Sequence, residues 1–279
     1  MNLYQLPWLA HVRFLILDMD GTLYQDLEFH HELCRVALEG TAFCGYADAS
    51  SALVDSVLAG DPRIPMPDFV DMGGLDGTVS AHQSSAARDP GDAHCGLAPL
   101  LARAPRHGLE EFTLAEVAGN NLISLADAWS VSFAVIRLFD LPVEARRETF
   151  YRVRSWMLTR LEPHASLNDA LAGSRLYKIL QTNSPLDTGL EFIHALLDPE
   201  SFHEIHCEAE KPRGLHMLIT RLLNDGVHPE EILSVGDHPW NDLKPARDLG
   251  CRTALISPYR GMPHGSSDLR LTTLDELAE

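Results

Sequence analysis

Two carboxylates, Asp18 and Asp20, directly follow an apolar run in the stretch FLILDMDGTLY. A carboxylate at such a position can attack a substrate as a nucleophile, and a second one two residues later can act as its acid and base. Two anions this close repel each other unless a cation lies between them, so the pair also predicts bound Mg²⁺. The sequence therefore indicates a reaction centre just after its first apolar run.

Three further groups of polar residues follow apolar runs in the second half of the chain. Thr182 and Asn183 supply a hydroxyl and an amide, and Lys211 supplies an ammonium. The stretch GDHPWND adds two more carboxylates, Asp237 and Asp242. A nucleophile, an acid, metal-binding carboxylates and donors for oxygen atoms are the parts of a phosphoryl-transfer site.

The elements that must position these residues alternate between two patterns. Short apolar runs predict five strands, over Arg13–Leu17, Leu176–Leu180, Phe202–Cys207, Ile232–Val235 and Arg252–Ile256. Helical spacing of apolar residues separates the later runs, over Leu190–Leu197, Leu215–Leu223 and Asp242–Leu249. This alternation predicts an α/β fold with a doubly wound parallel sheet, which carries its chemistry at the carboxyl ends of the strands.

About 150 residues of different character separate the first predicted strand from the second. Apolar periodicity predicts helices within Glu28–Leu58 and Leu114–Leu161, whereas residues 61–96 are rich in Gly, Pro, Asp and Ser and are expected to be irregular. We therefore predict an α/β core formed by residues 1–25 and 163–279, with a mainly helical domain inserted at residues 26–162.

Composition limits the classes of partner. Lys and Arg total 22 against 40 Asp and Glu, a net charge of −18, which argues against a nucleic-acid polymer or an anionic membrane surface as a partner. No apolar run is long enough to cross a bilayer, and the first residues lack the features of a secretory signal. The five cysteines are scattered, as expected for reduced thiols, so we expect a cytoplasmic protein.

The order DxDGT, TN, KP and GDxxxND resembles the four motifs of the haloacid dehalogenase (HAD) superfamily. The resemblance covers residues 13–24 and 163–279, and the intervals of 29 residues from Thr182 to Lys211 and 26 from Lys211 to Asp237 are also similar. It implies a HAD-like Rossmannoid core. Since the insertion follows the first motif, it also implies a C1-type cap, which closes over the site and excludes water.

Residue roles follow from this resemblance, motif by motif. Asp18 corresponds to the nucleophile that becomes a phosphoaspartate, and Asp20 to the general acid and base. Thr182, Asn183 and Lys211 correspond to the groups that bind phosphoryl oxygens. The metal ligands would be Asp18, Asp20 through its backbone carbonyl, Asp237 and Asp242.

Asp20 also separates branches of the superfamily. Dehalogenases lack an acidic residue two positions after the nucleophile, so its presence favours phosphate chemistry. Phosphonate cleavage would need a lysine in the insertion, but the first lysine of the chain is Lys178. We therefore expect a Mg²⁺-dependent phosphatase acting on a small phosphorylated metabolite.

One stretch of the sequence bears on the substrate class. The stretch DMDGTLY is similar to that of pyrimidine 5′-nucleotidase-like members, so a nucleotide or a sugar phosphate is expected. A phosphomutase would use the same core residues, and a non-catalytic binding protein could retain the fold. The oligomeric state is not indicated by the sequence.

Overall fold

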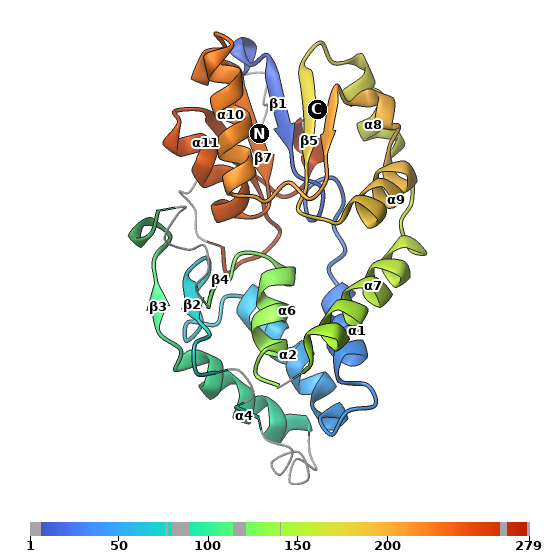
Figure 1. The fold of residues 1–279 in the computed structure, drawn as a ribbon, viewed down its shortest axis with the longest axis vertical. Coiled ribbons are helices and arrows are strands. Elements are labelled where there is room, and N and C mark those ends of the chain that lie inside the picture. Colours follow the sequence, from blue (N-terminus) through green and yellow to red (C-terminus); the bar gives the residue numbers. More distant parts are fainter. Residues whose placement is uncertain are drawn as a thin grey trace. The chain divides into compact units, whose positions relative to one another are not determined.

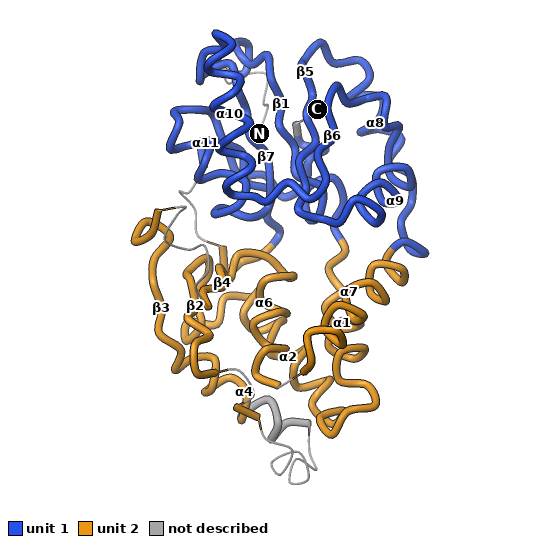
Figure 2. Tube along the Cα trace, viewed as in Figure 1, with its two compact units in different colours: residues 1–25, 158–258, 264–279 blue, residues 26–157, 259–263 orange. Residues whose placement is uncertain are grey.

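A short apolar strand, β1 (Phe14–Leu17), lies inside a six-stranded parallel sheet and is followed directly by Asp18. The computed structural model describes residues 7–75, 78–79, 90–113, 121–139, 141–262 and 267–277. It divides into unit 1, residues 1–25, 158–258 and 264–279, and unit 2, residues 26–157 and 259–263 (Figure 2).

The sheet of unit 1 has the strand order β6-β5-β1-β7-β8-β9, and every neighbouring pair is parallel. Its strands after β1 are β5 (Tyr177–Gln181), β6 (Glu204–His206), β7 (Ile232–Gly236), β8 (Arg252–Ile256) and β9 (Leu269–Leu271). β1 and β7 are almost continuously apolar because strands inside such a sheet are covered on both faces. The predicted doubly wound α/β class is confirmed.

In the described part of unit 1, four helices cover this sheet: α8 (Ala165–Gly173), α9 (Leu186–Leu196), α10 (Arg213–Asn224) and α11 (Lys244–Asp248). In Figure 1, α10 and α11 lie to one side of the labelled strands and α8 and α9 to the other. α10 buries Leu215, Leu218, Ile219 and Leu222, which share one helical face and pack with Ile16 of β1. This apolar layer fixes the strands whose ends carry the polar residues.

Unit 2 is mainly helical. Its helices are α1 (Phe29–Leu38), α2 (Ala47–Leu58), α4 (Pro90–Ala102), α6 (Ala128–Ile136) and α7 (Val143–Leu158), the last residue of which belongs to unit 1. α2 is central, because it packs against α1, α4 and α6 and buries Leu53, Val54 and Val57 completely.

Unit 2 also contains a three-stranded antiparallel sheet, which the sequence patterns did not predict. Its order is β3 (Arg106–His107), β2 (Phe69–Asp71) and β4 (Leu122–Ser124). β2 and the first half of α4 lie within residues 61–96, so the expectation of an irregular segment is wrong for these parts. β2 is ordered because Phe69 and Val70 are buried, while residues 76–77 and 80–89 lie outside the described part.

The unit boundaries differ from the predicted domain boundaries at two places. Residues 158–162, which we assigned to the insertion, belong to unit 1. Residues 259–263, which we assigned to the core, belong to unit 2, where the backbone N–H of Gly261 donates to the carbonyl of Leu58 at 3.1 Å. Unit 2 is therefore built from two segments of the chain, and the second one lies close to the C-terminal end.

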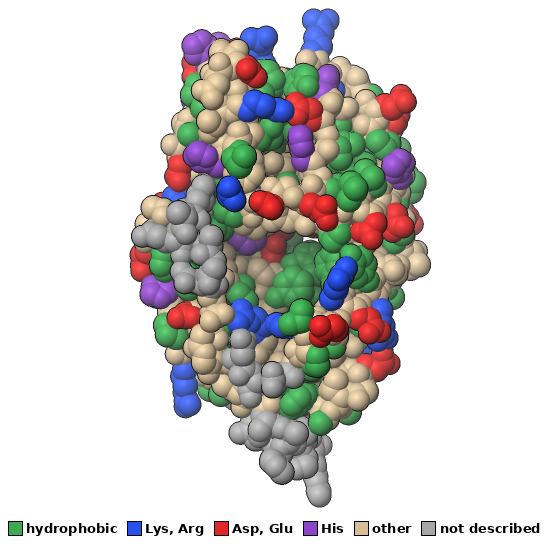
Figure 3. Space-filling view, viewed as in Figure 1, with side chains coloured by type: hydrophobic (Ala, Val, Ile, Leu, Met, Phe, Trp, Pro, Cys, Tyr) green, Lys and Arg blue, Asp and Glu red, His purple; other side chains and the backbone are tan. Residues whose placement is uncertain are grey.

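The face of unit 1 drawn in Figure 3 exposes both acidic and basic side chains, and several acidic ones form a row across the lower part of this unit. Among the described helices, none combines the length and the apolar character that crossing a membrane requires.

Candidate active site

The carboxyl ends of three adjacent strands bring the predicted site residues to one edge of the sheet. β1 lies between β5 and β7, with Leu17 in register with Leu180 and Val235. The next residues along the chain include Asp18 after β1, Thr182 after β5 and Asp237 after β7. The backbone N–H of Asp18 continues the ladder by donating to the carbonyl of Val235 at 2.9 Å.

Asp18 is buried, and both of its carboxylate oxygens accept hydrogen bonds. Oδ1 accepts from the ammonium of Lys211 at 2.5 Å, and Oδ2 accepts from the hydroxyl of Thr22 at 3.3 Å. These contacts fix the orientation of the carboxylate, which a nucleophile needs for attack along one direction.

Lys211 also bonds to a second carboxylate, because its ammonium donates to Oδ1 of Asp242 at 2.6 Å. The other oxygen of Asp242 accepts the backbone N–H of His238 at 2.9 Å. The lysine, which lies 193 residues from Asp18 in the sequence, thus links the end of β1 to the loop after β7.

Three carboxylates, those of Asp18, Asp237 and Asp242, form a group that could hold a metal ion. One oxygen of each lies within 4.8 Å of the others, and all three residues are buried. Hard cations such as Mg²⁺ prefer oxygen ligands. The donor set fits Mg²⁺, since three anions with the Lys211 ammonium leave excess negative charge that a divalent cation would neutralise.

The carboxylate of Asp20 is directed to different partners. Its Oδ2 accepts from the hydroxyl of Ser184 at 2.8 Å, and its Oδ1 accepts from the phenol of Tyr24. Among the described residues, it is not part of the three-carboxylate group. The two acidic residues of the first motif therefore have separate surroundings, which is what separate chemical tasks require.

Two glycines allow the carboxylates to approach the backbone. Gly21 has φ +76°, and a Cβ added there would overlap with Oδ2 of Asp237. A Cβ added at Gly236 would overlap with the side chain of Asp242. Both turns therefore need residues without a side chain.

Thr182 and Asn183 follow β5 but differ in their contacts. The hydroxyl oxygen of the buried Thr182 accepts the backbone N–H of Ser184 at 3.1 Å. Asn183 is exposed, and its amide bonds to the backbone of Lys211 on both sides, at 2.7 and 3.2 Å. In this arrangement Asn183 positions the lysine, a role that the resemblance did not indicate.

Burial and neighbouring charges shift the pKa values of Asp18 and Lys211. Burial raises the pKa of Asp18 to about 7, with Lys211 opposing the change and Asp242 and Asp20 adding to it. Burial acts to lower the pKa of Lys211, but Asp18 and Asp242 outweigh it, so the pKa rises. The two carboxylates therefore favour the charged form of the lysine.

Sequence reasoning missed the two hydroxyls that bond to Asp20. Ser184 follows Asn183 directly, and Tyr24 ends the first motif, so both were visible beside residues that we singled out. Ser184 is 164 residues from Asp20 in the sequence, and Tyr24 is brought to Asp20 by the turn that follows Asp20. A linear sequence pattern shows neither contact.

Several solved structures are similar to this chain over nearly its whole length. A predicted phosphoglycolate phosphatase from Haemophilus somnus 129pt is 17% identical over 96% of each chain, with a TM-score of 0.51. An L-2-haloacid dehalogenase is 16% identical over 96% of this chain and 97% of its own, with a TM-score of 0.48. A HAD phosphatase from Thermococcus onnurineus is 18% identical over 95% and 96%, with a TM-score of 0.42.

The chain has the haloacid dehalogenase fold. No protein-family model and no curated protein matches the sequence. At these low identities the likeness concerns the fold alone, and the HAD fold supports more than one reaction. The reaction must therefore be argued from the residues of this site.

Proposed function

We propose that this protein is a Mg²⁺-dependent phosphatase that hydrolyses a small phosphorylated metabolite through a phosphoaspartate on Asp18. The observation that carries the proposal is the division between Asp18 and Asp20. Asp18 is held by a buried ammonium beside two further carboxylates, whereas Asp20 is held by two hydroxyls. A nucleophile and a separate proton carrier are what two-step phosphate hydrolysis requires.

In the first step, a carboxylate oxygen of Asp18 forms a bond to phosphorus while the bond to the leaving oxygen breaks. Asp20 donates its proton to that leaving oxygen. In the second step, Asp20 takes a proton from a water molecule, whose oxygen attacks phosphorus, and the bond to Asp18 breaks. Inorganic phosphate leaves and both carboxyl groups return to their initial states.

The cations of the site would reduce repulsion between Asp18 and an anionic phosphate. Lys211 reaches Asp18 directly and would also bind a phosphoryl oxygen, together with the hydroxyl of Thr182. Mg²⁺ held by Asp18, Asp237, Asp242 and the carbonyl of Asp20 would supply further charge neutralisation when bound. Asn183 would act indirectly, by holding the backbone of Lys211.

A nucleotide or a sugar phosphate is the substrate class that we propose. Water is the final acceptor in this scheme, whereas a phosphomutase would return the phosphoryl group to another hydroxyl with the same residues. Asp20 disfavours carbon–halogen cleavage, because a dehalogenase has no leaving-group oxygen to protonate.

The test is phosphate release from a panel of nucleotides, sugar phosphates and p-nitrophenyl phosphate, each with Mg²⁺ and with EDTA. We expect release that needs Mg²⁺ and is lost in Asp18→Asn and Asp20→Asn. Asp225→Asn, a change at an exposed carboxylate after α10, serves as the matched control and should retain activity.

Each alternative predicts a different result. Full activity in Asp18→Asn would exclude the phosphoaspartate route. Transfer of phosphate between substrate hydroxyls without release would identify a mutase. Binding of substrate with neither release nor transfer would indicate a non-catalytic protein.

A further inference from the structure

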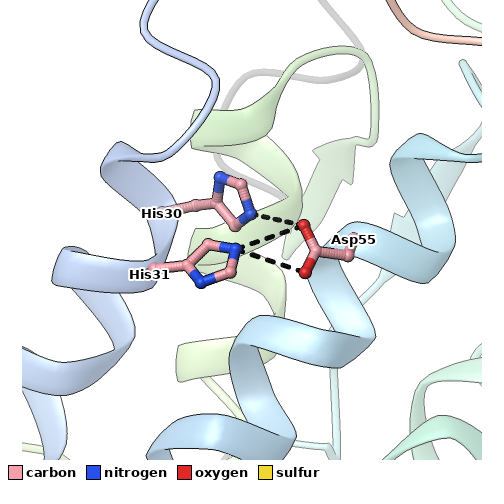
Figure 4. Close-up of side chains that lie close together, drawn as sticks. All are labelled: His30, His31 and Asp55. Carbon is pink, nitrogen blue, oxygen red and sulfur yellow. Dashed lines mark hydrogen bonds and ion pairs between the residues drawn. The ribbon is translucent and has the colours of Figure 1, made fainter.

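A second group of metal-ligand side chains lies in unit 2, apart from the site described above. His30 and His31 belong to the first turn of α1, and Asp55 belongs to α2. Figure 4 shows that both imidazole rings are directed toward the carboxylate of Asp55. One ligand atom of each residue lies within 4.8 Å of the others.

The two distances from the imidazoles to Asp55 are close to those between ligands of a tetrahedral ion. Nε2 of His30 lies 2.8 Å from Oδ1 of Asp55, and Nε2 of His31 lies 3.3 Å from the same oxygen. Bonds of about 2.0–2.1 Å to Zn²⁺ place neighbouring tetrahedral ligands ~3.4 Å apart. The His31 pair is already near this separation, and the His30 pair would need to open by roughly half an ångström.

Burial differs between the three ligands in a way that suits an open site. The side chain of His30 is 2% exposed, whereas His31 and Asp55 are 53% and 51% exposed. Solvent can therefore reach the side of the group that His31 and Asp55 form, and a water molecule could complete four-fold coordination.

Charge also favours binding at this position. The only charged group among the three ligands is the carboxylate of Asp55, which lies next to both imidazoles. A neutral imidazole is the form that binds metals. Asp55 supplies the negative charge, and its exposure allows it to move toward an ion.

We propose that His30, His31 and Asp55 bind a divalent ion of the Zn²⁺ type and thereby tie α1 to α2. Two imidazoles and one carboxylate favour Zn²⁺ over Mg²⁺, which prefers oxygen ligands only. The site would thus differ in metal preference from the Asp18, Asp237 and Asp242 group.

Proton positions set a limit on the affinity. An imidazole that binds through Nε2 carries its proton on Nδ1. Nδ1 of His30 is buried and, among the described residues, has no hydrogen-bond partner. Most metal-bound histidines have such a partner, which strengthens the site. We therefore expect weaker binding than in a closed four-ligand zinc site.

The test uses the full chain, stripped of metal with EDTA and then freed of the chelator. Zn²⁺ is titrated against a competing chromogenic chelator, and Co²⁺ absorption reports four-coordinate geometry. We expect His31→Ala and Asp55→Asn each to weaken Zn²⁺ binding by more than the ~10–100-fold that loss of an outer-sphere partner causes. His31 is half exposed, so this variant should fold even where a change at buried His30 does not.

Two controls separate this site from other ligands in the chain. His194→Ala removes an exposed histidine of α9, and Cys44→Ser removes an exposed thiol. Both should bind Zn²⁺ as the wild type does. The absence of Zn²⁺ binding in the wild type, or equal binding in His31→Ala and Asp55→Asn, would overturn the proposal and leave a hydrogen-bonded tie between two helices.

Discussion

The amide of Asn183 bonds to both backbone polar atoms of Lys211: its Oδ1 accepts the lysine N–H at 2.7 Å, and its Nδ2 donates to the lysine carbonyl at 3.2 Å. The two residues are 28 positions apart and follow different strands. Because the side chain of Lys211 reaches Asp18 from this fixed backbone, the asparagine controls the position of the ammonium without touching the carboxylates.

Asn183→Ala should therefore lower phosphate release by at least ~10-fold, since two hydrogen bonds of about 1 kcal/mol each are lost and each 1.4 kcal/mol changes a rate tenfold. Steady-state kinetics on the best substrate provide the measurement. Asn224→Ala, at an exposed position near the end of α10, is the matched control. Equal kcat/KM in Asn183→Ala and wild type would show that the lysine does not need this support.

Replacement of Asp18 by Asn should change how stability depends on pH. In the metal-free protein the pKa of Asp18 is raised from 3.8 to about 7, so the folded state binds a proton more tightly than the unfolded state does. The associated stability is fully present below pH 4 and is lost as the pH rises through about 7.

The Asp18→Asn variant has no carboxyl group that could titrate at this position. In EDTA, the Tm of the variant minus that of the wild type should therefore increase from pH 4 to pH 8, the window set by the two pKa values. Thermal unfolding of both proteins at several pH values measures the difference. A difference in Tm that stays constant across the range would contradict the raised pKa. Added Mg²⁺ should stabilise the wild type more than the variant.

Gly21→Ala should lower the stability of the protein by more than the strain of a positive φ alone would cause. A methyl group there would overlap with Asp237, in addition to the strain of a positive φ. Gly40→Ala is the control, since its φ is +69° and the space around it is open. We expect about 1 kcal/mol of destabilisation at Gly40 and a larger loss at Gly21, accompanied by weaker Mg²⁺ binding. Denaturant unfolding and metal titration measure both effects.

Tyr24→Phe and Ser184→Ala each remove one hydroxyl from Asp20. Since Asp20 is proposed to move protons rather than bind substrate, kcat should fall, by about 10-fold or more, while KM changes little. Tyr24→Phe retains the ring that packs 5.7 Å from that of Phe192. Tyr177→Phe removes a phenol that bonds to Glu204 instead and should leave both constants unchanged. An increase in KM with constant kcat would argue for a substrate-binding role.

Prediction from sequence succeeded where burial forces a simple pattern. β1 and β7 were recognisable because strands covered on both faces are apolar throughout, and the polar residues after them mark the edge of the sheet. α10 was recognisable from one buried face. The first, second and fourth motifs each stand next to such an element, so the carboxylates could be placed in advance.

Short strands and contacts between distant segments were not predictable in this way. β2, β4 and β9 contain three residues each, too few to show alternation, and they depend on neighbours that pair with them. His30 and His31 meet Asp55 only because α1 packs on α2. His203, by contrast, has a structural role, because its ring accepts the backbone N–H of Lys178 and stacks on Tyr177.

The position of β1 in the sheet has a consequence for the order of folding. β1 ends at residue 17, but its two neighbours are β5 at 177–181 and β7 at 232–236, so it stays unpaired until most of the chain has left the ribosome. Most of unit 2, by contrast, is one continuous segment from residue 26 to 157, which can begin to fold while β1 is still unpaired. Asp18 directly follows this strand, and the candidate site around it therefore forms among the last parts of the molecule.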